Sequence, residues 1–155
     1  DFIVVDGTAG KVQAIELFTT AIDTPDNRRI IVPNESVFGH RIENSTHNET
    51  RRVDVLVGVS YSADMKQTRR VLEDALASVP GALPNPAPVV YLSELNASSV
   101  DWSCRVWCRT PDYWDVKERL TESVKETLDR HGIGIPFPQL DLHVVTPTKQ
   151  VRKAA

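Results

Sequence analysis

The residues best suited to chemistry in this sequence are four histidines and two cysteines. A zinc site needs such ligands at short and regular spacings. The histidines are dispersed along the chain, and none has a second histidine or a cysteine at a metal-ligand spacing: they are His40, His47, His131 and His143. The sequence therefore predicts no metal site.

Cys104 and Cys108 stand in a run of alternating apolar residues, four positions apart. On an extended strand this spacing corresponds to roughly 13 Å. The two Cα atoms of a disulfide usually lie about 4.4–6.8 Å apart. We therefore expect two free thiols buried in a core, which fits a reducing compartment.

Two further patterns could belong to an active site. Asp141 and His143 lie on one side of a predicted strand, but no Gly-x-Ser-x-Gly nucleophile elbow accompanies them, and an acid-x-His strand is typical of a solvated polar face. The run Gly7-Thr8-Ala9-Gly10 lacks a Lys-Ser/Thr pair and precedes a strand, so it indicates a turn rather than a nucleotide-binding loop. The sequence thus predicts no catalytic residue and no cofactor site, and the protein is not expected to be an enzyme.

Composition narrows the class of protein further. Of the 155 residues, 41% are hydrophobic and 25% are charged, which is typical of a globular protein. The net charge of −3 argues against a nucleic-acid partner, because such partners select basic surfaces. Trp107 is better suited to packing or to a subunit contact than to stacking on bases.

No apolar run approaches the roughly 20 residues that span a bilayer. We therefore expect the given chain to be soluble. It begins with strand-like residues, Asp1-Phe2-Ile3-Val4-Val5, without an initiator methionine, and we expect it to be a fragment of a longer protein.

The first 50 residues show short alternating runs and no helical periodicity, a pattern that predicts a small barrel-like β module. Five strands are expected: Phe2–Val5, Lys11–Phe18, Thr19–Asp23, Arg28–Val32 and Arg41–Ser45. Thr24-Pro25-Asp26-Asn27 predicts a turn, because proline presets φ and asparagine tolerates a left-handed backbone. A module this small buries little surface alone, so we expect it to lean on neighbouring subunits.

From Arg51 the pattern becomes β-α-β-β-α-β, which is the ferredoxin-like arrangement and makes the fold class α+β. The predicted elements are a valine strand at 53–59, a helix capped by Ser62 and running to Val79, strands at Val89–Ser93 and Val100–Arg109, a helix at about Tyr113–His131 capped by Asp112 and ended by Gly132, and a last strand through Leu140, Leu142 and Val144. Pro136 and Pro138 precede that last strand and cannot donate to a ladder, so it is expected to leave the sheet.

Three segments, in order, resemble signatures of the small-conductance mechanosensitive (MscS-like) ion channel family. The first is Gly10-Lys11-Val12 through Thr20, followed by Arg29-Ile30-Ile31-Val32-Pro33-Asn34. The second is Arg51-Arg52-Val53, followed by Val57-Gly58-Val59-Ser60-Tyr61-Ser62-Ala63-Asp64. The third is Gly132-Ile133-Gly134-Ile135-Pro136-Phe137-Pro138-Gln139. Together they cover about residues 2–147.

The resemblance implies an Sm-like β domain at 1–50, a ferredoxin-like α-β domain at 51–136, and a C-terminal strand and tail at 137–155 that enters an intersubunit β-barrel. It also implies a ring of identical subunits, a homoheptamer, enclosing a vestibule on the cytoplasmic side of the inner membrane. Such a channel opens under membrane tension and releases ions and solutes in hypo-osmotic shock, with no cofactor. The transmembrane helices of the family are missing from this sequence.

The resemblance assigns a structural or assembly role to nine motif residues: Pro33, Asn34, Gly58, Tyr61, Asp64, Gly132, Pro136, Pro138 and Gln139. The alternative interpretation is a soluble ligand- or protein-binding module on a ferredoxin-like sheet, because that architecture supports many functions.

Overall fold

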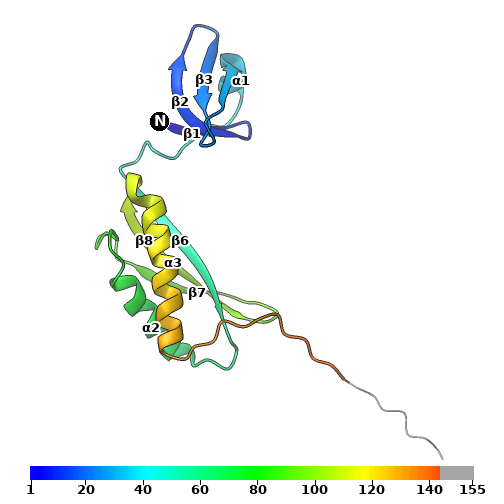
Figure 1. Cartoon of the computed structure of the whole chain (residues 1–155), viewed down its shortest axis with the longest axis vertical. Helices are drawn as coiled ribbons and strands as arrows, with labels where there is room; N and C mark the ends of the chain where they lie inside the picture. Colours follow the sequence, from blue (N-terminus) through cyan, green and yellow to red (C-terminus); the bar gives the residue numbers. More distant parts are fainter. Residues whose placement is uncertain (144–155) are drawn as a thin grey trace, which may run out of the picture.

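The computed structural model describes residues 1–143. The chain forms two modules joined by an extended connection (Figure 1). We refer to residues 1–47 as the β module and to residues 50–133 as the α-β module. The mixed α+β class expected from the sequence is confirmed, with antiparallel sheets in both modules. No helix within the described residues is long and apolar enough to cross a membrane.

The β module is one antiparallel sheet with the strand order β4-β3-β2-β1-β5. Its elements are β1 (Phe2–Val5), β2 (Thr8–Ile15), β3 (Thr19–Asp23), β4 (Arg29–Pro33), the helix α1 (Asn34–Gly39) and β5 (Glu43–Asn44). Alternation along these strands turns Ile3, Val5 and Ile22 inward, and these three form the buried core. The core is small, as the composition of the first 50 residues predicts.

Two sequence predictions for the β module are corrected. The run from Gly7 to Gly10 is not one turn: only Asp6 and Gly7 turn the chain, both with positive φ, and β2 already begins at Thr8. Gly10 lies inside β2, and a larger residue would not fit at this position because a Cβ would stand 2.5 Å from the carbonyl oxygen of Asp23. The segment after Pro33 was expected to be a connection and forms the short helix α1. Asn27 does adopt the left-handed backbone predicted for its turn, with φ of 63°.

The α-β module is a three-stranded sheet with the order β6-β8-β7. Its elements are β6 (Thr50–Val59), α2 (Met65–Ala77), β7 (Val89–Leu95), β8 (Val100–Arg109), the single turn η1 (Thr110–Asp112) and α3 (Tyr113–Arg130). α3 contacts β6, the strand at one edge, and α2 contacts β7, the strand at the other edge. Both helices cover the same face of the sheet (Figure 1).

A complete ferredoxin-like sheet would have a fourth strand beside β6. Residues 140–143 form no strand, which agrees with the two prolines that precede them, and the remainder of the predicted strand lies outside the described residues. Within residues 1–143, β6 is therefore an edge strand.

The core of the α-β module follows the predicted alternation along β8. Its inward side chains are at most 2% exposed: Val100, Trp102, Cys104, Val106 and Cys108. They meet the apolar stripe of α3, which comprises Val116, Leu120, Val124 and Leu128. This core is far larger than that of the β module, so the α-β module has the better means to fold independently.

The helix ends show one prediction wrong and one confirmed. Asp64, not Ser62, caps α2, since the Asp64 carboxylate accepts a hydrogen bond from the Gln67 amide at 2.7 Å. Gly132 follows α3 with φ of 68°, the Gly132 amide donates to the Asp129 carbonyl, and the Ile133 amide donates to the Leu128 carbonyl. These two bonds form a Schellman motif, as the position of the glycine predicts.

Candidate assembly surfaces

The nine motif residues do not gather into one cavity. Pro33 and Asn34 lie at the end of β4 and the start of α1, Asp64 and Gly132 lie at helix ends, and the others lie near the end of β6 or in the C-terminal segment. Within residues 1–143 there is no group of three or more His, Cys, Asp or Glu side chains that could hold a metal ion. Several of the motif residues contact backbone atoms of neighbouring segments.

Asn34 organises the loop between β2 and β3. Its Nδ2 donates to the carbonyls of Glu16 at 2.9 Å and Leu17 at 3.2 Å, and its backbone amide donates to the Phe18 carbonyl at 2.8 Å. Its Oδ1 accepts a hydrogen bond of 2.8 Å from the Thr20 hydroxyl, and Thr20 is itself buried. One side chain therefore satisfies two carbonyls that no strand pairs, and it fixes the loop in one shape.

The loop that Asn34 fixes carries three large apolar side chains into solvent. Ile15, Leu17 and Phe18 are 75%, 83% and 76% exposed. We call these three residues the apolar tip. A loop held rigid while it exposes such side chains is typical of a contact surface rather than of a solvated turn.

A second organised region lies where the C-terminal segment leaves the α-β module. The Ser60 amide donates to the Gly134 carbonyl at 2.9 Å, and the Gln139 amide donates to the Ser98 hydroxyl at 3.0 Å. The Tyr61 hydroxyl donates to the Asn96 carbonyl at 2.6 Å. We call this region, formed by residues 58–61, 96–101 and 134–139, the exit corner.

Gly58 lies in the exit corner at a position where a side chain would not fit. A Cβ on Gly58 would lie 2.8 Å from both Cβ and Oγ of Ser99 and 2.8 Å from Oδ1 of Asp101. Ser99 and Asp101 are joined by a hydrogen bond of 2.7 Å at the start of β8. The glycine thus allows the hairpin between β7 and β8 to close against β6 and to meet the outgoing segment.

From Pro136 in the exit corner onward, the chain is without regular secondary structure and exposes apolar side chains. Phe137, Leu140 and Leu142 are 85%, 81% and 79% exposed. Pro136 and Pro138 flank Phe137 and keep this part of the chain out of the sheet, because proline has no amide to donate. Within the described residues this segment has no strand partner.

The cysteines are core residues without reactive character. Both are free and buried, as predicted. Burial raises the pKa of the Cys104 thiol to about 12. Burial also raises the pKa of Cys108, with a further upward contribution from Asp112 and an opposing one from Arg51. Since the thiolate is the nucleophile, neither cysteine is suited to covalent chemistry.

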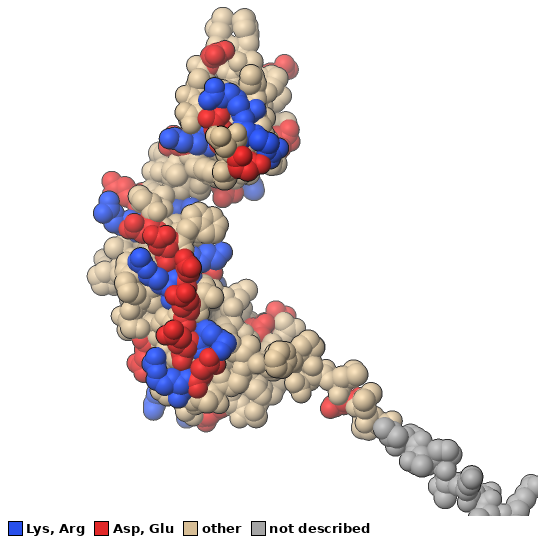
Figure 2. Space-filling view, viewed as in Figure 1, with Lys and Arg blue, Asp and Glu red and all other residues tan. Residues whose placement is uncertain are grey.

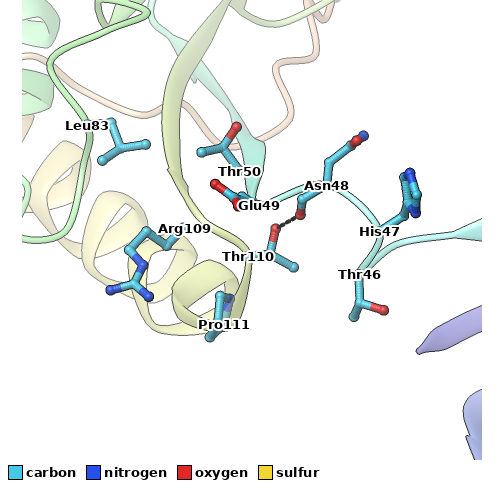
Figure 3. Close-up of a pocket in the computed structure, with 9 residues that line it drawn as sticks. All are labelled: Thr46, His47, Asn48, Glu49, Thr50, Leu83, Arg109, Thr110 and Pro111. Carbon is cyan, nitrogen blue, oxygen red and sulfur yellow. Dashed lines mark hydrogen bonds between the residues drawn. The ribbon is translucent and has the colours of Figure 1, made fainter.

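A pocket of about 790 Å³ lies at the junction of the two modules (Figure 3). Thr110 joins its two sides: the Thr110 hydroxyl donates to the Asn48 carbonyl at 2.5 Å, and the Thr110 amide donates to the Glu49 carbonyl at 2.9 Å. The side chains of His47 and Arg109 point away from one another (Figure 3). A ligand site needs convergent polar groups, which this pocket does not provide.

Comparison with known families identifies both modules. A family model described as "Mechanosensitive ion channel MscS, C-terminal" matches residues 53–135, and one described as "Mechanosensitive ion channel, beta-domain" matches residues 1–47. The chain is 39% identical over 143 residues to a small-conductance mechanosensitive channel of Edwardsiella ictaluri, covering 92% of this chain and 50% of that protein. It is 30% identical over 145 residues to the small-conductance mechanosensitive channel of Helicobacter pylori, covering 93% of this chain and 53% of that protein. The chain therefore spans about half the length of these relatives.

Solved structures agree with the sequence matches. The crystal structure of Helicobacter pylori MscS in its closed state superposes with a TM-score of 0.89 at 30% identity, covering 95% of this chain and 58% of that one. The cryo-EM structure of Arabidopsis thaliana MSL1 gives a TM-score of 0.75 at 18% identity over 89% of this chain and 52% of that one, a likeness of fold alone. Both modules and their order are thus shared with a solved MscS chain.

Proposed function

The chain belongs to the mechanosensitive ion channel MscS family, and we propose that it is the vestibule portion of a channel subunit that opens under membrane tension. In this proposal identical subunits form a ring, a homoheptamer, beneath a membrane pore supplied by the rest of the protein. Ions and small solutes pass through the ring in hypo-osmotic shock. The chain lies on the cytoplasmic side of the inner membrane and carries no enzymatic activity.

The observation that carries the proposal is the ordered match of both modules to channel families over nearly all of the described chain. The exposed apolar surfaces support it. Within residues 1–143 the apolar tip and the segment after Pro136 expose large apolar side chains, and exposed apolar surface of this kind marks interaction sites. A closed ring would cover both on every subunit at once.

The nine motif residues fit this proposal as determinants of assembly. Asn34, following Pro33, holds the apolar tip, while Gly58, Tyr61 and Gln139 hold the exit corner. Asp64 and Gly132 define the ends of α2 and α3. Pro136 and Pro138 keep the segment that follows them, as far as residue 143, out of the sheet. The division at 1–50, 51–136 and 137–155 is part of the same proposal.

The alternative of a soluble ligand-binding module gains little from the junction pocket, because the His47 and Arg109 side chains that line it point away from one another (Figure 3). An experiment separates the two. The full-length protein is expressed in a bacterial strain that lacks its own mechanosensitive channels, and survival after a hypo-osmotic downshift is measured together with currents from membrane patches under suction.

We expect rescue of survival and tension-gated currents, and light scattering should give a ring mass for the purified protein. A full-length protein that is monomeric and produces no tension-gated current would refute the proposal. Removal of residues 137–155 provides a control, because the truncated protein should reach the membrane but assemble poorly.

A further inference from the structure

The exposed face of α3 carries a row of acidic side chains. The row consists of Asp115, Glu118, Glu122, Glu126 and Asp129, all of them exposed. Their spacing of three or four residues places them on one face of the helix, opposite the buried stripe of Val116, Leu120, Val124 and Leu128. Figure 2 shows the row as a continuous acidic band along α3.

The acidic row destabilises α3. Glu118, Glu122 and Glu126 follow each other at four-residue intervals, and like charges at this spacing destabilise a helix. The basic residues of α3 lie mainly beside the row: Lys117, Arg119, Lys125 and Arg130. Only Lys125 pairs with a member of it, Asp129. Within α3, the three glutamates have no ion-pair partner.

A basic groove lies at the opposite edge of the same sheet, between α2 and β7. It has a volume of about 350 Å³, and its lining includes Lys66, Arg69 and Arg70 with a single acid, Glu73. Arg69 is fixed, since its Nη1 donates to the Val90 carbonyl at 2.8 Å and its guanidinium lies 5.2 Å from the centre of the Trp102 ring. Within residues 1–143, Lys66 and Arg70 form no ion pair.

Trp102 forms an apolar part of the lining of this groove. Trp102 is only 1% exposed, and its buried Nε1 has no hydrogen-bond acceptor among the described residues. A buried indole N–H normally has a partner. A carboxylate seated in the groove would meet Lys66 and Arg70, which form no ion pair within residues 1–143.

The two surfaces lie on opposite edges of the α-β module, which favours a contact between copies. The acidic row is on α3, over the β6 edge, and the basic groove is on the β7 edge. Two complementary surfaces at opposite edges form a heterologous, head-to-tail contact when copies stand side by side, and a contact of this kind generates a ring when the rotation closes.

We propose that the basic groove of one copy binds the acidic row on α3 of the next copy. The contact rests on the proposed ring and specifies one of its interfaces. Lys66 and Arg70 pair with glutamates of the row, while Arg69 and the Trp102 indole form the floor of the groove. The contact sets the direction in which neighbouring α-β modules follow one another, because complementary charge specifies orientation.

The test uses the full-length protein purified in detergent. A water-soluble carbodiimide joins a lysine amine to a carboxylate that it already touches, and cross-links between copies appear as a ladder of covalent multimers on a denaturing gel. The variant Lys66→Gln removes the amine in the groove. The matched control Lys117→Gln removes an exposed amine beside the acidic row but outside the groove.

A second measurement uses charge reversal. Arg70→Glu and Glu122→Lys are made singly and together, and dissociation of the ring on dilution is followed by mass photometry. Each single reversal should raise the dissociation constant of the interface about 5-fold, and the double variant should return to within about twofold of the wild type. Attraction is restored with its direction reversed, so the effects should cancel rather than add.

Support for the contact is a ladder that Lys66→Gln abolishes and Lys117→Gln preserves, together with compensation in the double reversal. A ring with an unchanged ladder in Lys66→Gln, or reversals whose effects add, would overturn this contact and leave the channel function intact. A full-length protein that forms no ring would instead overturn the proposed function itself.

Discussion

Replacing Asn34 with alanine should loosen the β module while leaving the α-β module unchanged. The substitution removes the donor that satisfies the Glu16 and Leu17 carbonyls and the acceptor of the Thr20 hydroxyl. It leaves the backbone amide of residue 34 bonded to the Phe18 carbonyl. The loop that presents the apolar tip therefore loses its side-chain ties but keeps its path.

The expected cost follows from which groups lose a partner. The two loop carbonyls are exposed, so water replaces the lost donor and the net loss there is small. Thr20 is only 4% exposed, so its hydroxyl is left without an acceptor and carries a desolvation penalty. Together these terms should lower the free energy of unfolding of the β module by about 2 kcal/mol, which raises its opening constant about 30-fold.

Hydrogen exchange measures this change, and the sequence supplies an internal control. The three tryptophans and three tyrosines all lie beyond residue 60, so intrinsic fluorescence reports only the α-β module. Amides in β2 and β3 should exchange about 30-fold faster in Asn34→Ala. The urea midpoint followed by tryptophan fluorescence should stay the same.

Thr20→Val tests whether the buried hydroxyl is the origin of the effect. It removes the same hydrogen bond from the other side and should cost about 1 kcal/mol. Because both substitutions remove one shared bond, the double variant should be less destabilised than the sum of the single variants. Exchange in Asn34→Ala within threefold of the wild type, or fully additive effects, would show that Asn34 does not hold the loop through Thr20.

Three further changes test the α-β module. Asp64→Ala removes the cap that bonds the Gln67 amide and should cost about 1 kcal/mol, seen as a lower urea midpoint that Asp64→Asn largely recovers. Gly132→Ala forces a side chain into a backbone with φ of 68° and should cost about 1–2 kcal/mol by the same measurement. Because the pKa of Cys104 is raised to about 12, the folded thiol should resist a disulfide reagent at pH 8 and react in urea. The free energy of unfolding should also fall as the pH rises from about 8.5, where the thiol ionises in the unfolded chain, towards the pKa of about 12 in the folded protein. A urea midpoint that stays constant over this pH range would contradict the raised pKa of Cys104.

The elements that the sequence predicted best are those in which one period dominates. The strand Val100–Arg109 has the expected bounds and the expected buried face, because five apolar residues alternate without interruption. α3 was similarly clear, and it ends at Arg130 because Gly132 beyond it adopts the left-handed backbone that glycine favours. Local signals decide such cases, and tertiary contacts only reinforce them.

The errors occurred where the local sequence was compatible with more than one structure. Ser62 and Asp64 are both good caps. The Ser62 hydroxyl instead bonds the Ser60 hydroxyl at 2.8 Å, in the turn that meets the C-terminal segment. In the β module, Gly10 resembled a turn glycine, but it lies in β2, where the close backbone of β3 leaves no room for a side chain. The place of Gly10 depends on a contact between segments distant in the sequence, which local pattern does not contain.

The family resemblance singled out the nine motif residues, but the sequence did not reveal which atoms they contact. Pro33-Asn34 stood out only through the family resemblance, and the partners of Asn34 lie 14 to 18 residues earlier in the chain. Gln139 likewise bonds Ser98, 41 positions away. Periodicity is a property of one strand or helix at a time, so it predicts these elements but not the hydrogen bonds that join two loops.

The imbalance between the two modules has a consequence for assembly. In residues 1–47, the buried hydrophobic core consists of Ile3, Val5 and Ile22, whereas six large apolar side chains are exposed: Ile15, Leu17, Phe18, Ile31, Phe38 and Ile42. Each such side chain contributes about 1.5–3 kcal/mol when it becomes fully buried. The β module therefore has more to gain from covering its surface than its own core supplies. If neighbouring copies cover that surface, ring formation is part of the folding energetics of this module, and the rigid apolar tip that Asn34 holds is where folding and assembly are coupled.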